Sequence, residues 1–166
     1  KTRIETQNAL DGIPYTNEVA RQVCHLNQAL GRLKYAPSDE ILRKYIPKSS
    51  PFPPESRAGA IWGLGHLHAD KPDDELAALL GGRLSDVNPM DPEAEEVRTM
   101  SPISLGRMKA EKSLALLRKF LVSESVNSTV GYGCGWAIET ITGEPMEKPV
   151  AQEVPGLGWF LDPLDP

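Results

Sequence analysis

The stretch VRTMSPISLGRM at residues 97–108 decides the fold, because it returns along the chain. Its best match is SRAGAIWGLGHL at 56–67, which has an arginine, small residues and Leu-Gly at the same places. Weaker matches are QVCHLNQALGRL at 22–33 and VGYGCGWAIETI at 130–141. Self-similarity at a period of about 20–50 residues is typical of stacked repeat proteins.

One position of this phrase sets the alignment of all four copies. It is a glycine in three of them, and a glutamate takes its place in the fourth. We call these the register positions: Gly31, Gly65, Gly106 and Glu139. The copies are therefore spaced by 34, 41 and 33 residues. The insertion SDVNPMDP at 85–92, rich in turn-forming residues, accounts for the longest spacing.

Each copy predicts the first helix of a helical hairpin, because its Leu, Ile and Met residues recur at spacings of three and four. The small residues of the phrase let neighbouring helices approach closely. A polar break and a second apolar helix follow each of the first three copies, and these second helices contain 41–46, 79–84 and 116–121. Gly81-Gly82 in the middle one marks either a close backbone approach or a weak helix.

The pattern predicts one helical domain over 1–143, followed by an irregular tail. Residues Ile4–Leu10 fit the second helix of an incomplete upstream unit. The tail at 144–166 contains several prolines, which exclude a long helix, yet it is rich in apolar residues. We expect it to pack on the last repeat and cover its open apolar face. Docking onto another chain or domain is the alternative. The expected units span about 15–48, 55–84, 93–122 and 127–143.

The phrase Arg-x-x-Ala-x-x-Ala-Leu-Gly-x-Leu, followed by a Leu-rich helix, resembles HEAT-like repeats of the phycobilisome-lyase type. The resemblance covers roughly 15–143 and is close in the second and third copies. It implies an all-α fold, a right-handed α-solenoid of stacked antiparallel helix pairs with about four HEAT-like repeats. The first copy departs from the pattern at Leu26, which replaces an alanine, and the fourth has Gly131 in place of the arginine.

The resemblance implies a non-catalytic scaffold that binds another protein or another domain of its parent chain. The parent is expected to be a larger bacterial protein of which this chain is a domain or fragment. Two alternatives stay open: a chromophore (bilin) lyase or lyase subunit, and a nucleic-acid-binding repeat protein. The net charge of −5 disfavours nucleic acid as a partner. No apolar run reaches the roughly 20 residues of a membrane helix.

Five basic residues of the second helices fall in nearly the same register. If these helices line the concave face, as the resemblance implies, their side chains form a stripe for an acidic peptide or a phosphate group. The alternative is the solvated face of amphipathic helices. The five residues of this predicted stripe are Arg43, Lys44, Arg83, Arg118 and Lys119.

Arg57 and Arg98 hold the arginine position of the family phrase. The resemblance implies that this residue pairs with an acid of the adjacent unit and fixes the stacking. The candidate acids are Glu55, Asp86 and Glu96.

Three cations, Arg32, His66 and Arg107, directly follow the register glycines. A cation near a helix C-terminus is stabilised by the helix dipole, so a structural role is sufficient for them. His66 and His68 are two residues apart and do not share a helix face, which disfavours a metal site.

We expect no catalytic residue, metal or cofactor. The sequence holds no phosphate loop, nucleophile elbow or zinc motif. Cys24 and Cys134 lie three units apart, too far for a disulfide, and are expected to be buried thiols. The composition, 40% apolar and 25% charged, is that of a soluble globular protein. The first residues lack a signal peptide and an initiator Met, which suggests a processed form and leaves the compartment open, with a cytoplasmic location favoured.

Overall fold

The computed structural model describes residues 17–146, which form seven α-helices and two 3-10 helices and contain no strand. The all-α expectation is thus confirmed for this part of the chain. The predictions for Ile4–Leu10 and for the tail beyond residue 146 lie outside the described residues. None of the helices within 17–146 combines the length and the apolar character needed to cross a bilayer. The elements are α2 (Asn17–Arg32), η1 (Ala36–Ser38), α3 (Asp39–Arg43), α4 (Pro54–Leu67), α5 (Asp74–Ser85), α6 (Glu95–Arg107), η2 (Glu111–Ser113), α7 (Leu114–Glu124) and α8 (Thr129–Thr142).

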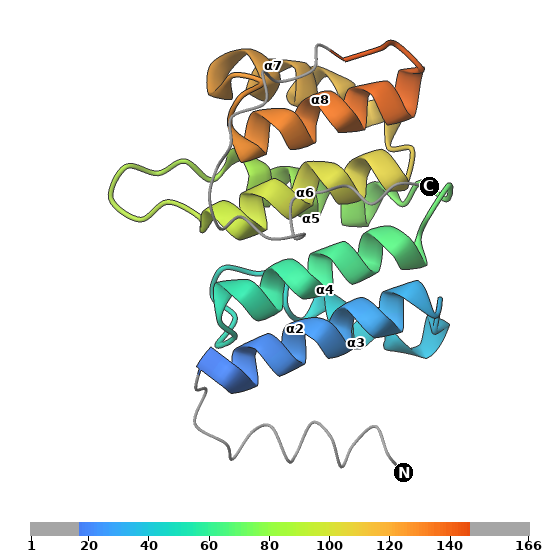
Figure 1. The fold of residues 1–166 in the computed structure, drawn as a ribbon, viewed down its shortest axis with the longest axis vertical. Coiled ribbons are helices and arrows are strands. Elements are labelled where there is room, and N and C mark those ends of the chain that lie inside the picture. The colour runs from blue at the N-terminus through green and yellow to red at the C-terminus, as the bar shows by residue number, and fades with distance from the viewer. Residues whose placement is uncertain (1–16, 147–166) are drawn as a thin grey trace.

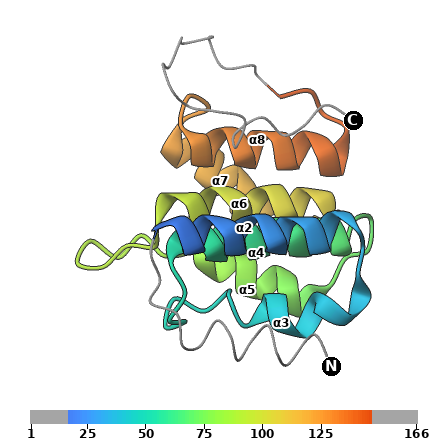
Figure 2. The same ribbon diagram turned by 60° about the horizontal axis from the view of Figure 1, so that its bottom comes forward.

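The helices form two layers. In the first layer α2, α4, α6 and α8 lie side by side, each packed against the next (Figure 1). The second layer, α3, α5 and α7, lies behind the first in that view, as Figure 2 shows from another direction. There α3 packs against α4, α5 against α6, and α7 against α8. Each helix of the second layer therefore packs against the helix that follows it in the chain.

The register glycines are the points at which neighbouring first-layer helices touch. Each of them lies against the small residue two places before the register position of the next helix. A β-carbon added at the glycine would approach the α-carbon of that residue to 2.4 Å at Gly31–Gly63, 2.8 Å at Gly65–Ser104 and 2.8 Å at Gly106–Ala137. Such distances leave no room for a side chain. In α8, which no further described helix follows, Glu139 occupies the register position.

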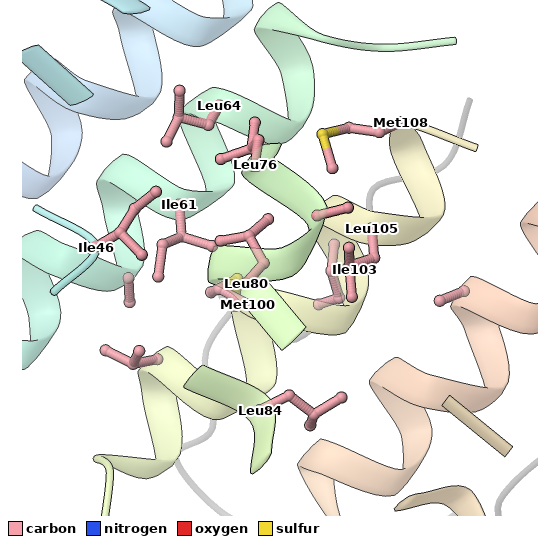
Figure 3. Close-up of a cluster of buried hydrophobic side chains, with 14 of the residues drawn as sticks. Ile46, Ile61, Leu64, Leu76, Leu80, Leu84, Met100, Ile103, Leu105 and Met108 are labelled. Atoms are coloured by element: carbon pink, nitrogen blue, oxygen red, sulfur yellow. The ribbon is translucent and has the colours of Figure 1, made fainter. Parts of the chain in front are cut away.

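The hydrophobic core lies between the two layers (Figure 3). Leu64 in α4 and Leu105 in α6, each of which directly precedes a register glycine, are fully buried, whereas Leu30 before Gly31 is half-buried. From the second layer, α5 contributes Leu76, Leu80 and Leu84, whose spacing of four places them on one face of the helix. Removing one such side chain typically costs about 2–5 kcal/mol of stability.

The second helix of the first unit is shorter than predicted. Helix α3 ends at Arg43, whereas the sequence pattern extends the helix to Ile46. Pro47 explains the difference, because the residue before a proline is disfavoured in the helical conformation. Tyr45 and Ile46 are buried all the same, and Tyr45 stacks on Phe52 with ring centres 3.9 Å apart. Their backbone carbonyls are thereby left to accept hydrogen bonds from another element.

The insertion after α5 forms a loop that extends away from the helical layers (Figure 1). Its base is held by Lys48, whose ammonium group lies 3.5 Å from Asp86 and 3.0 Å from Asp91. Met90 near its tip is 92% exposed. The insertion therefore lengthens the connection between α5 and α6 without entering the core.

Candidate functional site

Two of the five basic residues predicted to form a stripe bind acids in neighbouring units. Arg43 donates to Asp39 at 2.7 Å and to Asp73 at 2.5 Å, and so joins α3 to the start of α5. Arg83 donates to Glu93 at 2.9 Å, and so joins α5 to the segment before α6. These two guanidinium groups are largely neutralised by the protein itself.

The other three basic residues, Lys44, Arg118 and Lys119, are exposed. The Lys44 ammonium lies 3.7 Å from Glu40, and Arg118 donates to Glu144 at 2.9 Å. The Lys119 ammonium lies 5.6 Å from the centre of the adjacent phenyl ring. Exposed pairs of this kind contribute roughly 1 kcal/mol or less, so a partner can displace them. The stripe stays a prediction, with three rather than five members open to solvent.

Arg57 is the centre of a buried polar network that links three segments. Its Nη1 and Nη2 atoms donate to the two carboxylate oxygens of Glu93 at 2.8 and 2.7 Å. Its Nε and Nη2 atoms donate to the carbonyls of Tyr45 and Ile46 at 3.1 and 3.0 Å. The side chains of Arg57 and Glu93 are only 4% and 1% exposed. One arginine thus joins the end of the first unit, helix α4 and the segment before α6.

The acids that pair with the two phrase arginines differ from those expected. Arg57 binds Glu93, and Arg98 binds Glu124 at the end of α7. The expected acids were Glu55, Asp86 and Glu96. Because α6 begins at residue 95, Glu93 precedes the helix and its side chain reaches the interior. Arg98 pairs within its own unit, since the last turn of α7 lies beside it.

Aromatic and basic side chains gather on the first-layer helices α4, α6 and α8. We call Trp62, His66, Arg107 and Trp136 the Trp–Arg cluster. The guanidinium carbon of Arg107 lies 4.9 Å from the centre of the Trp62 ring and 5.8 Å from that of Trp136. The His66 ring packs on Trp62 with centres 4.0 Å apart. Cation–π contacts of this kind contribute about 0.5–2 kcal/mol. The guanidinium therefore bridges three helices.

Two polar atoms of the Trp–Arg cluster lack hydrogen-bond partners. They are Nη1 of Arg107 and Nε2 of His66, and both are buried. A buried polar group without a partner typically costs about 1–3 kcal/mol. Among the residues that the structure describes, these are the buried side-chain nitrogen or oxygen atoms left in this state. Within the described residues, the buried side-chain atoms that could still form a hydrogen bond therefore belong to the Trp–Arg cluster.

The local charge of the cluster is positive. Burial, and secondarily the charge of Arg32, lowers the pKa of Arg107 to about 10, so the guanidinium stays protonated at neutral pH. Burial, followed by the charges of Arg107, Arg32 and Lys34, lowers the pKa of His66 to about 4. The imidazole is consequently neutral at pH 7, and one fixed positive charge lies between the two indole rings.

From sequence alone, helix-dipole stabilisation is a sufficient role for His66 and Arg107, and nothing links them to the two tryptophans. The signal is nevertheless present in the repeat register. Trp62 and Trp136 each lie three places before a register position, and His66 and Arg107 each lie one place after. Residues three and four apart share a helix face, so this spacing brings all four to one face of adjacent helices.

The thiols and the other histidines offer no comparable chemistry. Cys24 and Cys134 are both free and buried, and burial raises the pKa of each to about 12, so neither is a thiolate at neutral pH. His68 is bonded to Asp39 at 2.5 Å. Residues 17–146 contain no group of three His, Cys, Asp or Glu side chains placed to hold a metal ion.

The buried neutral state of His66 predicts a pH dependence of stability. Its folded pKa of about 4 lies below the ordinary value of 6.5, so the unfolded chain binds more protons between these pH values. The contribution of neutral His66 to the free energy of unfolding is present above pH 6.5. It falls by about 2–3 kcal/mol as the pH drops from 6.5 to 4. His66→Gln is expected to flatten this part of the curve in urea denaturation. Parallel curves for the intact chain and for His66→Gln would refute the assignment.

Comparisons of the chain with family models, curated proteins and solved structures find no match.

Proposed function

We propose that the chain is a right-handed α-solenoid of stacked antiparallel helix pairs, built from about four HEAT-like repeats. Equivalent residues making equivalent contacts support this. The three register glycines share one mode of contact. The turns after α2 and α6 also match: Lys34 and Lys109 have positive φ angles of 48° and 57°. In each turn the next residue donates a backbone hydrogen bond back to the leucine before the register glycine, Tyr35 to Leu30 and Ala110 to Leu105.

The phrase arginines support the same proposal. Arg57 Nε donates to the carbonyl of Tyr45, just beyond the end of α3. Arg98 Nε donates to the carbonyl of Leu84, near the end of α5. Each arginine therefore binds the end of the preceding second-layer helix, which is the contact that a stacked repeat requires.

The function best supported by this geometry is that of a non-catalytic scaffold that binds another protein, or another domain of the same parent chain. The Trp–Arg cluster is the observation that carries it. Tryptophan and arginine dominate the binding energy of protein interfaces when they lie together in well-packed surroundings. Here Trp62, Arg107 and Trp136 meet across three helices, with hydrogen-bonding capacity left over. The buried Arg57 and the half-buried Arg43, by contrast, bind carboxylates of the protein itself.

A capture experiment with matched baits tests this function. The intact chain, a cluster variant (Trp62→Leu with Arg107→Gln) and a stripe variant (Lys44→Gln with Lys119→Gln) are immobilised and exposed to native extract. Circular dichroism first shows that all three are equally folded. We expect proteins retained by the intact chain and by the stripe variant to be lost from the cluster variant.

The opposite result assigns binding to the basic stripe instead. If the stripe variant loses proteins that the cluster variant retains, then the second-layer face is the interface. If the intact chain retains no protein above the level of an uncoated resin, the scaffold function is wrong.

A further inference from the structure

The unpaired nitrogens of the Trp–Arg cluster define what a partner must supply. Nη1 of Arg107 is a donor, and it is buried without an acceptor. Nε2 of His66 is likewise without a partner. The indole rings beside Arg107 offer their π-faces, which attract the positive charge but accept no full hydrogen bond. The cluster therefore lacks an oxygen acceptor.

The surrounding charges favour an acceptor that is negatively charged. The described charges that act on His66 are Arg107, Arg32 and Lys34, and the one that acts on Arg107 is Arg32. All of them are cationic. A neutral carbonyl would satisfy the donor but not the charge, whereas an oxyanion satisfies both.

Between the common oxyanions, the position of the cluster favours a singly charged one. His66 and Arg107 lie in the last turns of α4 and α6. The C-terminal end of a helix carries the negative end of the helix dipole, and backbone N–H donors point the other way. A phosphate dianion is held best at helix N-termini, where such donors are free. A carboxylate needs only the planar fork of one guanidinium.

We propose that Arg107 is the binding point for a carboxylate side chain of a partner protein, held between Trp62 and Trp136. This inference rests on the proposed scaffold function. Arg107 is partly exposed, so part of its side chain reaches the surface although Nη1 is covered. Rotation of the side chain about its terminal bonds brings both terminal nitrogens to an incoming carboxylate, and such rotamer changes are fast. The indole faces then pack on the aliphatic part of the partner's Asp or Glu.

Titration of the full chain with a small carboxylate tests this without any partner protein. The probe is N-acetylglutamate α-amide, whose only charge is the side-chain carboxylate, and N-acetylglutamine amide is its neutral counterpart. The readout is the indole N–H signals of Trp62 and Trp136 in nuclear magnetic resonance spectra, identified through Trp62→Phe and Trp136→Phe. We expect saturable shifts with the carboxylate, at least tenfold weaker binding of the neutral probe, and loss of the shifts in Arg107→Gln. Arg21→Gln, at an exposed arginine of α2, serves as the matched control and keeps them.

Three outcomes overturn the proposal: equal shifts with both probes, unchanged shifts in Arg107→Gln, or tighter binding of inorganic phosphate than of the carboxylate. The result is independent of the capture experiment. If the carboxylate binds but no protein is captured, the carboxylate site is supported and the scaffold function is wrong. If a protein is captured through the cluster but no carboxylate binds, the proposed carboxylate chemistry is wrong.

Discussion

Replacing Glu93 by Ala is expected to lower the free energy of unfolding by about 3–5 kcal/mol, because it leaves the buried guanidinium of Arg57 without its carboxylate. Both side chains are almost wholly buried, and both carboxylate oxygens are bonded to Arg57. Glu93 also accepts from Arg83 at 2.9 Å. The substitution therefore leaves two cations, Arg57 and Arg83, without the carboxylate that they share. Urea denaturation of the intact and substituted chains measures the difference.

The matched control is an exposed ion pair. Lys112 and Asp74 are 79% and 66% exposed, and Lys112→Ala is expected to change stability by less than about 1 kcal/mol. The double change Arg57→Met with Glu93→Leu removes both charges and is expected to recover most of the loss. If Glu93→Ala costs no more than Lys112→Ala, the network does not hold the units together.

The Arg57–Glu93 pair also predicts how acid acts on the protein. Burial by itself raises the pKa of Glu93, but hydrogen bonds from Arg57 and from the backbone of Ala94, together with the Arg57 charge, outweigh it and leave the pKa below its ordinary value. A carboxylate with a depressed folded pKa contributes stability above its unfolded pKa and loses it as the pH falls through the folded pKa. The difference between Glu93→Ala and the intact chain should therefore shrink in acid.

The elements that a local pattern determines were predictable from the sequence. A glycine at the register position of the first three copies favours close helix approach, and Gly31, Gly65 and Gly106 all lie where neighbouring helices touch. The burial of Leu64 and Leu105 follows from the same register. These features depend on the spacing of residues along one helix, and that spacing is visible in the sequence.

Contacts between units were not predictable, since they depend on how the connecting segments turn. Glu93 stands at the start of the third expected unit, but α6 begins two residues later, and the Glu93 carboxylate reaches Arg57. The Trp–Arg cluster needs three helices in place before Trp62, Arg107 and Trp136 meet, although each holds a definite register place. The sequence identifies the residue type at each position. Whether a nitrogen such as Nη1 of Arg107 has a hydrogen-bond partner depends on which residues surround it in the folded protein.

A glycine-to-alanine exchange at Gly31 is expected to destabilise the protein by about 3 kcal/mol or more, whereas the same exchange at Gly82 stabilises it by about 1 kcal/mol. At Gly31 the new methyl group would lie 2.3 Å from the carbonyl oxygen of Gly63 and 2.4 Å from its α-carbon. Both atoms belong to backbone inside α4, so α2 and α4 must move apart. At Gly82, in the exposed part of α5, no atom beyond its chain neighbours and the adjacent helix backbone lies within 4 Å of the added group.

The paired experiment separates packing from intrinsic helix preference. Alanine favours a helix over glycine at both positions, so helix preference alone predicts two stabilised proteins. Only the close contact of α2 with α4 makes the signs differ. Thermal and urea denaturation of both variants therefore test whether the register glycines hold the first layer together. If Gly31→Ala is as stable as Gly82→Ala, the helices do not approach at that glycine, and the repeated contact on which the solenoid proposal depends is lost.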